Sequence, residues 1–404
     1  MVKKVRAVAA LLGPAFVAAV AYVDPGNFAA NFSAGSQYGY TLLWVLVLAN
    51  LMAMLVQYLS AKVGLVTGLS LPEVVAIKLG RKSRIAYWFQ AELVAIATDL
   101  AEVIGGAIAL HILFGIPPLI GATITGVVSL LLLLIYSKRG QKIFERIIIG
   151  LLLIIPVGFF VGLFIQPPNG GEMISGLIPQ LRNKEMVMLA AAMLGATVMP
   201  HVVYLHSALV RDRHGKKRKV ELHTLLRATK IDVGIAMIVA GAVNISMLLL
   251  AASALQGQPA TDTLQGIFAA LNTHVSPIVA GLFGVSLLVS GFASTAVGGH
   301  AGAVIMDGLL KRRIPLWWRR IITIIPAVVI VAIGVNPTQA LLFSQVILSF
   351  GIPFALVPLF LATSSKKIMG EYKNTTLVMY LLSVIIAIII ALNLALIWLT
   401  LSAK

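Results

Sequence analysis

The sequence contains a series of apolar runs, each roughly 20 residues long, and this pattern limits the possible folds more than any other feature. A run of that length crosses the hydrocarbon core of a bilayer as a single helix. We expect eleven spans, at 9–33, 40–64, 86–113, 117–136, 147–165, 186–210, 231–255, 276–307, 321–335, 338–363 and 375–401. Because 59% of the residues are hydrophobic and only 11% are charged, the composition excludes a soluble enzyme. We predict an all-α polytopic membrane protein.

The net charge of +17 is unevenly distributed along the chain. If the N-terminus is cytoplasmic, all but three of the 31 Lys and Arg residues lie in cytoplasmic segments; the exceptions are Arg182, Lys184 and Lys404. This positive-inside bias favours eleven spans with that orientation. The basic segment at 211–219 is interpreted first as a topology determinant and second as a lipid-binding segment. Nucleic acid is not an expected partner.

The N-terminal segment needs a separate decision, because Lys3, Lys4 and Arg6 precede an apolar run as in a signal peptide. Ten later spans favour an uncleaved anchor, and cleavage near Ala21 would destroy the motif described next. We therefore expect the first run to remain in the protein. The chain has no Cys, which excludes disulfides and thiolate ligands within it.

Two of the spans are interrupted by proline. The first carries Asp24-Pro25-Gly26-Asn27, and the sixth carries Met199-Pro200-His201. Proline lacks an N–H and glycine favours non-helical dihedrals, so both helices should break there. Breaks at corresponding positions of two halves point to the substrate site of a transporter. The halves would be an inverted pair, 1–165 and 186–363, followed by an extra helix at 375–401.

Donor atoms around the two breaks suit a divalent transition metal ion. Asp24 has a carboxylate, Asn27 has an amide oxygen, and unwinding frees backbone carbonyls at Ala21 and Ala196. Met199 adds a thioether, which is a poor ligand for Mg²⁺ or Ca²⁺ but is acceptable to softer ions. The set favours Mn²⁺ or Fe²⁺, with Co²⁺ and Cd²⁺ admitted. The alternative for the methionine is a gap-filling role in the core.

The third span is unusually polar. Glu92, Asp99 and Glu102 are spaced by seven and three residues, which puts them on roughly one helical face. Three aligned acids favour an ion or proton path over a purely structural role. His201, next to the second break, can exchange a proton near neutral pH. His206 lies five residues further on, so the two histidines are a poor metal-binding pair.

Several other polar residues have a structural interpretation, and some of them also have a second one. Asp232 is interpreted as part of a surface salt bridge with the basic loop. Arg319 and Arg320 either snorkel to the interface or pair with buried acids. Gln345, a lone amide in an apolar span, is either a helix–helix hydrogen-bonding group or a substrate ligand.

The motifs taken together resemble one family. DPGN in the first span and MPHVVYLHSALV in the sixth, with QAELVAIATDLAE, LWWRR and SQVILSFGIPFALVP, are similar to the Nramp family of proton-coupled divalent metal ion transporters. Val202 stands where many relatives have Asn, and a twelfth span found in some relatives is absent. The retained Met199 argues against the magnesium-transporting branch.

The resemblance implies a LeuT-type fold with a 5+5 inverted repeat, broken helices 1 and 6, and alternating access. It implies metal binding at positions matching Asp24, Asn27, Met199, Ala21 and Ala196, with Gln345 joining in some conformations. It implies a proton route at positions matching Asp24, His201, Asp99, Glu102, Glu92, Arg319 and Arg320.

We therefore expect a monomeric, multi-pass cell-membrane transporter that imports Mn²⁺ or Fe²⁺ together with H⁺. Metal ions and protons would be its substrates and the lipid bilayer its surroundings, with no cofactor and no enzymatic activity. An organic-substrate carrier of amino-acid type on the same fold, which would not need the thioether, is the first alternative. A cation channel without proton coupling is the second.

Overall fold

The structure is a computed structural model that describes residues 13–215, 220–312 and 314–402. Every regular element within these residues is helical. Nine spans in this part of the chain are long and apolar enough to cross a membrane: α4 Leu43–Thr67, α6 Arg81–Phe114, α7 Pro118–Arg139, α8 Gln141–Ile165, Lys184–His214, α12 Leu222–Ala254, α14 Pro277–Leu310, α16 Pro337–Thr363 and α18, Thr376–Ser402.

Two further spans complete the expected eleven. The first is broken into α2 Pro14–Ala21 and α3 Pro25–Tyr38, each too short to cross alone. The other is α15, Leu316–Ala332, which has only 17 residues. The span Lys184–His214 is also broken, into α10 Lys184–Thr197 and α11 Pro200–Val210, followed by one π-helical turn at Arg211–Gly215. Both breaks predicted from proline are confirmed.

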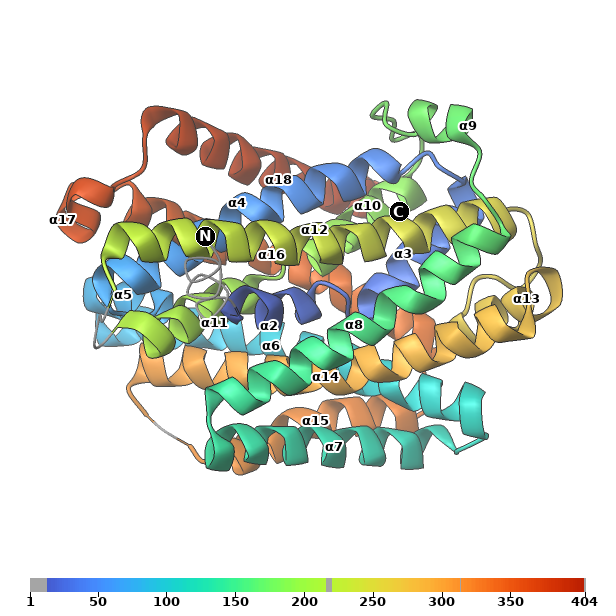
Figure 1. Cartoon of the computed structure of the whole chain (residues 1–404), viewed down its shortest axis with the longest axis horizontal. Helices are drawn as coiled ribbons and strands as arrows, with labels where there is room; N and C mark the ends of the chain where they lie inside the picture. Colours follow the sequence, from blue (N-terminus) through green and yellow to red (C-terminus); the bar gives the residue numbers. More distant parts are fainter. Residues whose placement is uncertain (1–12, 216–219, 313, 403–404) are drawn as a thin grey trace, which may run out of the picture.

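Four short connecting helices lie in two pairs at opposite ends of the long helices. In Figure 1, α5 Leu71–Lys78 and α17 Lys366–Met369 lie at one end, and α9 Gly170–Ser175 and α13 Leu264–His274 lie at the other. This is the arrangement that chain alternation across a membrane requires. At the start of α5, Ser70 and Glu73 form a reciprocal capping box.

The broken helices lie in the interior of the bundle, between α6, α12, α14 and α16. The paired helices α7 and α15 form one edge of the view and α18 forms the opposite edge (Figure 1). Small residues let the central helices approach closely: the position that a Cβ of Gly291 in α14 would take lies 3.0 Å from the Cα of Gly106 in α6.

Several span ends differ from the predicted ones. The basic loop predicted between 136 and 147 reduces to Gly140 (φ 84°), and α12 begins at Leu222 rather than at 231. Hydropathy marks only the part of a helix that lies in hydrocarbon, whereas these helices continue into polar sequence. Residues 1–12, 216–219 and 403–404 lie outside the described residues. They include the basic N-terminus, the end of the basic segment at 211–219, and Lys404.

Candidate metal and proton site

The first break is a capped helix start inside the protein. Asp24 is the N-cap of α3: its Oδ1 accepts from the Asn27 N–H at 2.8 Å, and the Asn27 Oδ1 accepts from the Asp24 N–H at 3.1 Å. Both side chains are fully buried. Among the described residues, the second carboxylate oxygen of Asp24 has no hydrogen-bond partner. A buried, unpaired carboxylate oxygen is costly and is suited to a cation.

Both predicted carbonyls lose their helical hydrogen-bond donor for the same reason. In a helix each C=O accepts from the N–H four residues later. The residue four after Ala21 is Pro25 and the residue four after Ala196 is Pro200, so neither carbonyl has that donor. No hydrogen bond to either carbonyl is found within the described ranges. Two main-chain oxygens are therefore available, one at each break.

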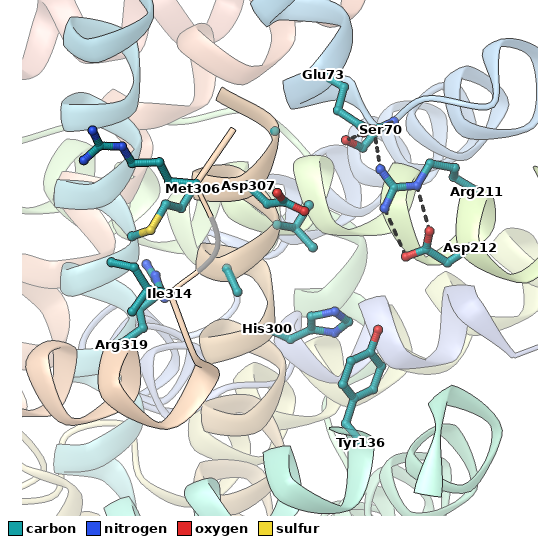
Figure 2. A pocket seen from close by; sticks show the side chains of 14 residues that line it. Ser70, Glu73, Tyr136, Arg211, Asp212, His300, Met306, Asp307, Ile314 and Arg319 are labelled. Atoms are coloured by element: carbon teal, nitrogen blue, oxygen red, sulfur yellow. Dashed lines mark hydrogen bonds and ion pairs between the residues drawn. The ribbon is translucent and has the colours of Figure 1, made fainter. Parts of the chain in front are cut away.

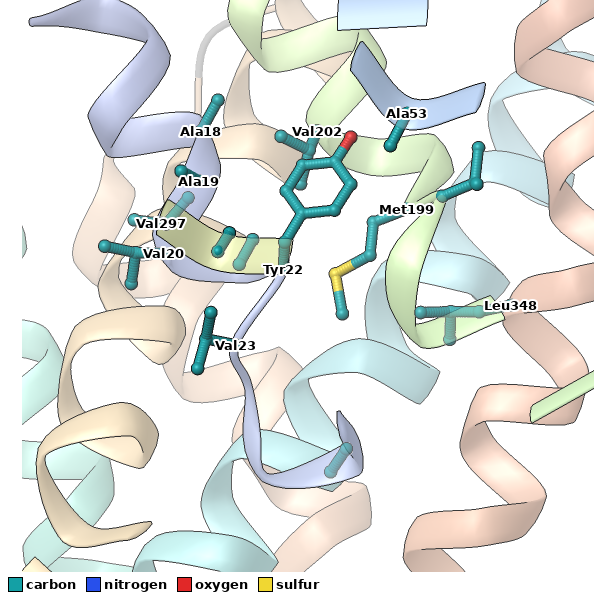
Figure 3. Close-up of a cluster of buried hydrophobic side chains, with 14 of the residues drawn as sticks. Ala18, Ala19, Val20, Tyr22, Val23, Ala53, Met199, Val202, Val297 and Leu348 are labelled. Atoms are coloured by element: carbon teal, nitrogen blue, oxygen red, sulfur yellow. The ribbon is translucent and has the colours of Figure 1, made fainter. Parts of the chain in front are cut away.

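The second break is apolar. Met199 is the N-cap residue of α11, is fully buried, and makes no side-chain capping bond in this part of the structure. Figure 3 shows its side chain pointing from the second break toward the segment at Tyr22 and Val23 in the first break. The thioether therefore faces the first break, and its role as a ligand stays a prediction.

Gln345 of α16 lies against both breaks. A Cβ added to Gly26 would meet the Gln345 amide nitrogen, and one added to Gly195 would meet the Gln345 backbone oxygen, at only 1.8 and 2.0 Å. Glycine is needed at both positions for this close approach. The Gln345 side chain is fully buried and its Oε1 has no partner among the described residues. This position is compatible with a ligand role, which stays a prediction.

His201, in the first turn of α11, faces the third span. Its Nδ1 lies 3.2 Å from the Thr98 hydroxyl of α6, and its Nε2 has no partner in the described chain. His206 instead lies 2.7 Å from the Gln57 Oε1 of α4. The two histidines therefore face different helices and do not share a site, as their spacing predicts.

The acids of α6 face two arginines of α15. Glu92 pairs with Arg319 at 2.6 Å, and Asp99 pairs with Arg320. The arginines therefore pair with acids of α6, of which Asp99 is buried and Glu92 is partly buried, and do not snorkel. Glu102 is different: it is fully buried, and neither carboxylate oxygen has a partner within the described residues. The position of a Cβ on Gly298 of α14 would be 2.8 Å from its Oε2.

The prediction for Asp232 is wrong. This residue is 3% exposed and accepts hydrogen bonds at 3.0 Å from the backbone N–H groups of Gly13 and Ala15. It therefore caps the N-terminus of α2 from α12. Proximity to a basic loop in the sequence suggested a salt bridge, but the unpaired N–H groups of a helix start are an equally good partner for a carboxylate.

Sequence reasoning missed the side chains that hold the first break open. Asn244 of α12 donates to the Tyr22 carbonyl at 2.7 Å, and Ser290 of α14 donates to the Val23 carbonyl at 2.5 Å. The Tyr22 hydroxyl in turn contacts the Gln57 amide. A polar residue in an otherwise apolar helix was the available signal, but it does not identify the partner.

A cavity of about 270 Å³ opens beside Arg319, where α14 ends and α15 begins. Figure 2 shows Glu73 and Arg211 on one side of it and His300, Asp307 and Arg319 on others. The described residues contain no group of three or more His, Cys, Asp or Glu side chains that could hold a metal ion. A metal at the breaks would therefore depend on a single carboxylate, that of Asp24, together with carbonyl, amide and thioether donors.

The arrangement combines eleven spans, two helices broken at the centre of the bundle, and unpaired oxygen and sulfur donors where the breaks meet. A fold with broken helices at its centre is that of a polytopic membrane transporter. Residues 15–399 match the model of the family described as Nramp, natural resistance-associated macrophage protein-like. The chain belongs to the Nramp family.

Relatives cover nearly the whole chain. The divalent metal cation transporter MntH of Mycobacterium tuberculosis (strain ATCC 25618 / H37Rv) is 54% identical over 96% of this chain and 91% of its own length. MntH of Bacillus subtilis (strain 168) is 47% identical over 97% and 92%. The crystal structure of the Eremococcus coleocola manganese transporter superposes with a TM-score of 0.87 at 32% identity, covering 96% of this chain and 86% of that one.

More distant structures share the fold alone. Mhp1, a nucleobase-cation-symport-1 family transporter, matches with a TM-score of 0.63 at 15% identity over 96% of this chain and 92% of its own. MhsT, solved in complex with L-phenylalanine, gives the same score and identity over 97% and 98%. The predicted LeuT-type fold with broken helices 1 and 6 is confirmed.

Proposed function

We propose that this protein imports divalent transition metal ions, Mn²⁺ and Fe²⁺ foremost, together with H⁺ by alternating access. The observation that carries the proposal is the meeting of two broken helices at unpaired donors. The freed carbonyls of Ala21 and Ala196, the open oxygen of Asp24, and the thioether of Met199 lie at the breaks. The names of the MntH relatives and of the Eremococcus coleocola transporter support a metal substrate.

The ligand set accounts for selectivity. Carboxylate, amide and carbonyl oxygens accept any hard divalent cation, including Mg²⁺ and Ca²⁺. Adding a thioether favours ions that tolerate a softer donor, which include Mn²⁺, Fe²⁺, Co²⁺ and Cd²⁺. Gln345 supplies a further amide oxygen. Asn27 already uses its oxygen to cap α3, so in metal binding that oxygen is shared or the cap is released.

Protons would leave the metal site through α6. The open Nε2 of His201 and the unpaired carboxylate of Glu102 are the first carriers beyond Asp24. The pairs Asp99–Arg320 and Glu92–Arg319 continue along the same helix. Arg319 also lines the inner cavity, so the route ends at water on that side.

The remaining features follow from this assignment. The inverted repeats would be 1–165 and 186–363, with α18 outside them, in a multi-pass protein of the cell membrane. The positive-inside bias supports a cytoplasmic N-terminus. We propose a monomer in the lipid bilayer that needs no cofactor and catalyses no reaction, with metal ions and protons as its only substrates.

The test is Mn²⁺ uptake into proteoliposomes that contain a pH-sensitive dye, with Mg²⁺ as competitor. We expect saturable uptake, acidification of the lumen, and indifference to excess Mg²⁺. Asp262→Asn, an exposed carboxylate between α12 and α13, is the matched control and should behave as wild type. Unsaturable flux would contradict a carrier, and absence of uptake by folded protein would favour an organic substrate.

Proton coupling has its own variant. Glu102→Gln removes the titratable carboxyl group without stranding a partner, because no described group is bonded to it. We expect Mn²⁺ uptake to continue with less acidification per metal ion. Acidification equal to that of wild type would remove Glu102 from the route.

A further inference from the structure

The helix that carries Gln345 contains two prolines in its second half. Pro353 and Pro358 lie inside α16. Each deprives the carbonyl four residues earlier of its helical donor, so the carbonyls of Ser349 and Phe354 need partners elsewhere. The structure supplies both partners from other helices.

Ser349 is satisfied by α18. The Asn393 Nδ2 donates to the Ser349 carbonyl at 2.9 Å, and the Ser349 hydroxyl donates to the Asn393 Oδ1 at 2.7 Å. Asn393 is 5% exposed and Ser349 is fully buried. The two residues therefore form a closed, two-bond clamp between α16 and the helix at the edge of the molecule (Figure 1).

The second freed carbonyl is held differently. The Phe354 carbonyl accepts from the Tyr204 hydroxyl of α11 at 3.1 Å, and also from Tyr87 of α6. These partners lie on helices of the two repeats. Of the two carbonyls freed by proline, only that of Ser349 therefore receives its donor from α18, a helix outside both repeats.

The clamp lies one helical turn from the candidate ligand. Gln345 and Ser349 are four residues apart in α16, and Gly195 packs on the turn between them: a Cβ there would meet the Gln345 backbone oxygen at 2.0 Å and the Ser349 nitrogen at 2.9 Å. Gly195 directly precedes Ala196, whose carbonyl is freed at the second break. The Gln345 side chain lies against Gly26 of the first break. A shift of this turn would move Gln345 relative to both breaks.

We propose that Asn393 is a positioning residue for the metal site, and that it fixes Gln345 by satisfying the Ser349 carbonyl that Pro353 leaves without a donor. The inference rests on the proposed function, because Gln345 must bind the metal. It gives α18 a role in positioning a metal ligand, which counting the membrane spans does not reveal. An amide in an otherwise apolar helix is costly unless it is bonded, and here both of its polar atoms are bonded.

The first test compares Asn393→Leu with wild type in full-length protein, using Mn²⁺ alone as the probe. We expect the Kd for Mn²⁺ from calorimetry to rise about tenfold, as for other partners that orient a metal ligand. Ser383→Leu is the matched control, because Ser383 is exposed on α18 and bonds only within its own helix. An unchanged Kd in folded Asn393→Leu would overturn the proposal.

Rescue by proline replacement separates positioning from general packing. Pro353→Ala restores the backbone N–H that can pair with the Ser349 carbonyl. In that background we expect Asn393→Leu to change the Kd by less than about twofold, against the tenfold of a lost orienting partner. A full tenfold loss in the double variant would show that the clamp acts otherwise.

The last test asks whether the effect passes through Gln345. In a Gln345→Ala background, Asn393→Leu should no longer change the Kd, because the ligand it positions is gone. If Asn393→Leu does not yield monodisperse protein, Ser349→Ala, which removes only the hydroxyl bond, takes its place in the same cycle. Additive effects would overturn the proposal. Absence of Mn²⁺ binding by wild type would instead defeat the proposed function.

Discussion

The two helix breaks are alike in backbone and opposite in chemistry. Each has a proline that frees the carbonyl four residues earlier, at Ala21 and at Ala196. The first break is polar: Asp24 caps α3, and the neighbouring carbonyls receive side-chain donors from α12 and α14. The second break has Met199 as its N-cap, without a side-chain capping bond in the described structure. The first break therefore contributes a charged carboxylate and hydrogen-bonded carbonyls, and the second contributes the softer thioether donor.

The two broken helices are also held differently at the ends that lie away from the breaks. Asp232 caps the start of α2 directly through two backbone N–H groups. The end of α11 is held through a side chain, because Arg211 in the following π-helical turn pairs with Glu73 of α5. Arg213 in the same turn also pairs with Glu145 of α8. The first broken span is therefore anchored by carboxylates that accept from backbone N–H groups, whereas the second is anchored by two arginine–carboxylate ion pairs.

The largest effect should come from the polar break. Asp24→Asn keeps a residue that can cap α3 but removes the charge that faces the cation. We expect the Kd for Mn²⁺ to rise by at least about 100-fold, since even outer partners of a metal ligand are worth ten- to a hundredfold. Calorimetry with Mn²⁺ measures it. A Kd within tenfold of the wild-type value would mean that the Asp24 carboxylate is not the main charged ligand.

The apolar break should control selectivity more than affinity. Met199→Ala should weaken Mn²⁺ binding roughly tenfold, or about 1.4 kcal/mol, while Ca²⁺ becomes a better competitor. Competition by Ca²⁺ and Mg²⁺ in the uptake assay measures this change. Met193→Ala, an equally buried methionine of α10, is the control for lost volume. Equal selectivity in the two variants would assign Met199 to core packing.

The shared backbone device can be tested at both breaks. Pro25→Ala and Pro200→Ala each restore an N–H that competes for the freed carbonyl, at Ala21 and at Ala196 respectively. We expect a loss of Mn²⁺ affinity of about two- to tenfold in each, the size of one net hydrogen bond. Pro156→Ala, inside α8, is the control. A loss at one break only would show that a single carbonyl binds the metal.

The smallest effect concerns the anchor of α11. Burial tends to raise the pKa of Glu73, but hydrogen bonds from Ser70 and the charge of Arg211 outweigh it and lower that pKa below its ordinary 4.5. The stabilisation is therefore present above pH 4.5 and is lost as the pH falls through the folded-state value. Glu73→Gln should lower the melting temperature at pH 7 by about 1–2 °C.

The pH dependence supplies the control for that variant. The difference in melting temperature between wild type and Glu73→Gln should shrink as the pH is lowered toward 4. A difference that stays constant over this range would mean that the carboxylate charge plays no part in holding α11.

Patterns local in sequence predicted most of the fold and both helix breaks. Apolar length gave the spans, and proline gave both breaks together with the carbonyls four residues earlier. The spacing of Glu92, Asp99 and Glu102 predicted that the three acids share one face of a helix. The two arginine pairs lie along that face.

Partners distant in sequence were not predictable in the same way. Asp232 bonds to Gly13, 219 residues away, and Asn244 bonds to Tyr22, 222 residues away. A lone polar residue in a span indicates that some partner exists. Which one depends on how the helices face each other, and a single sequence does not encode that in any local spacing.

The short length of α15 has a consequence for the surrounding membrane. Its 17 residues span about 26 Å at 1.5 Å per residue, and Arg319 and Arg320 occupy its first turns. The apolar remainder is shorter than a hydrocarbon core of about 30 Å, so we expect lipids to thin beside this helix. The acids of α6 would then face the narrowest part of the bilayer. Transport should accordingly depend on lipid chain length, with long-chain lipids opposing it.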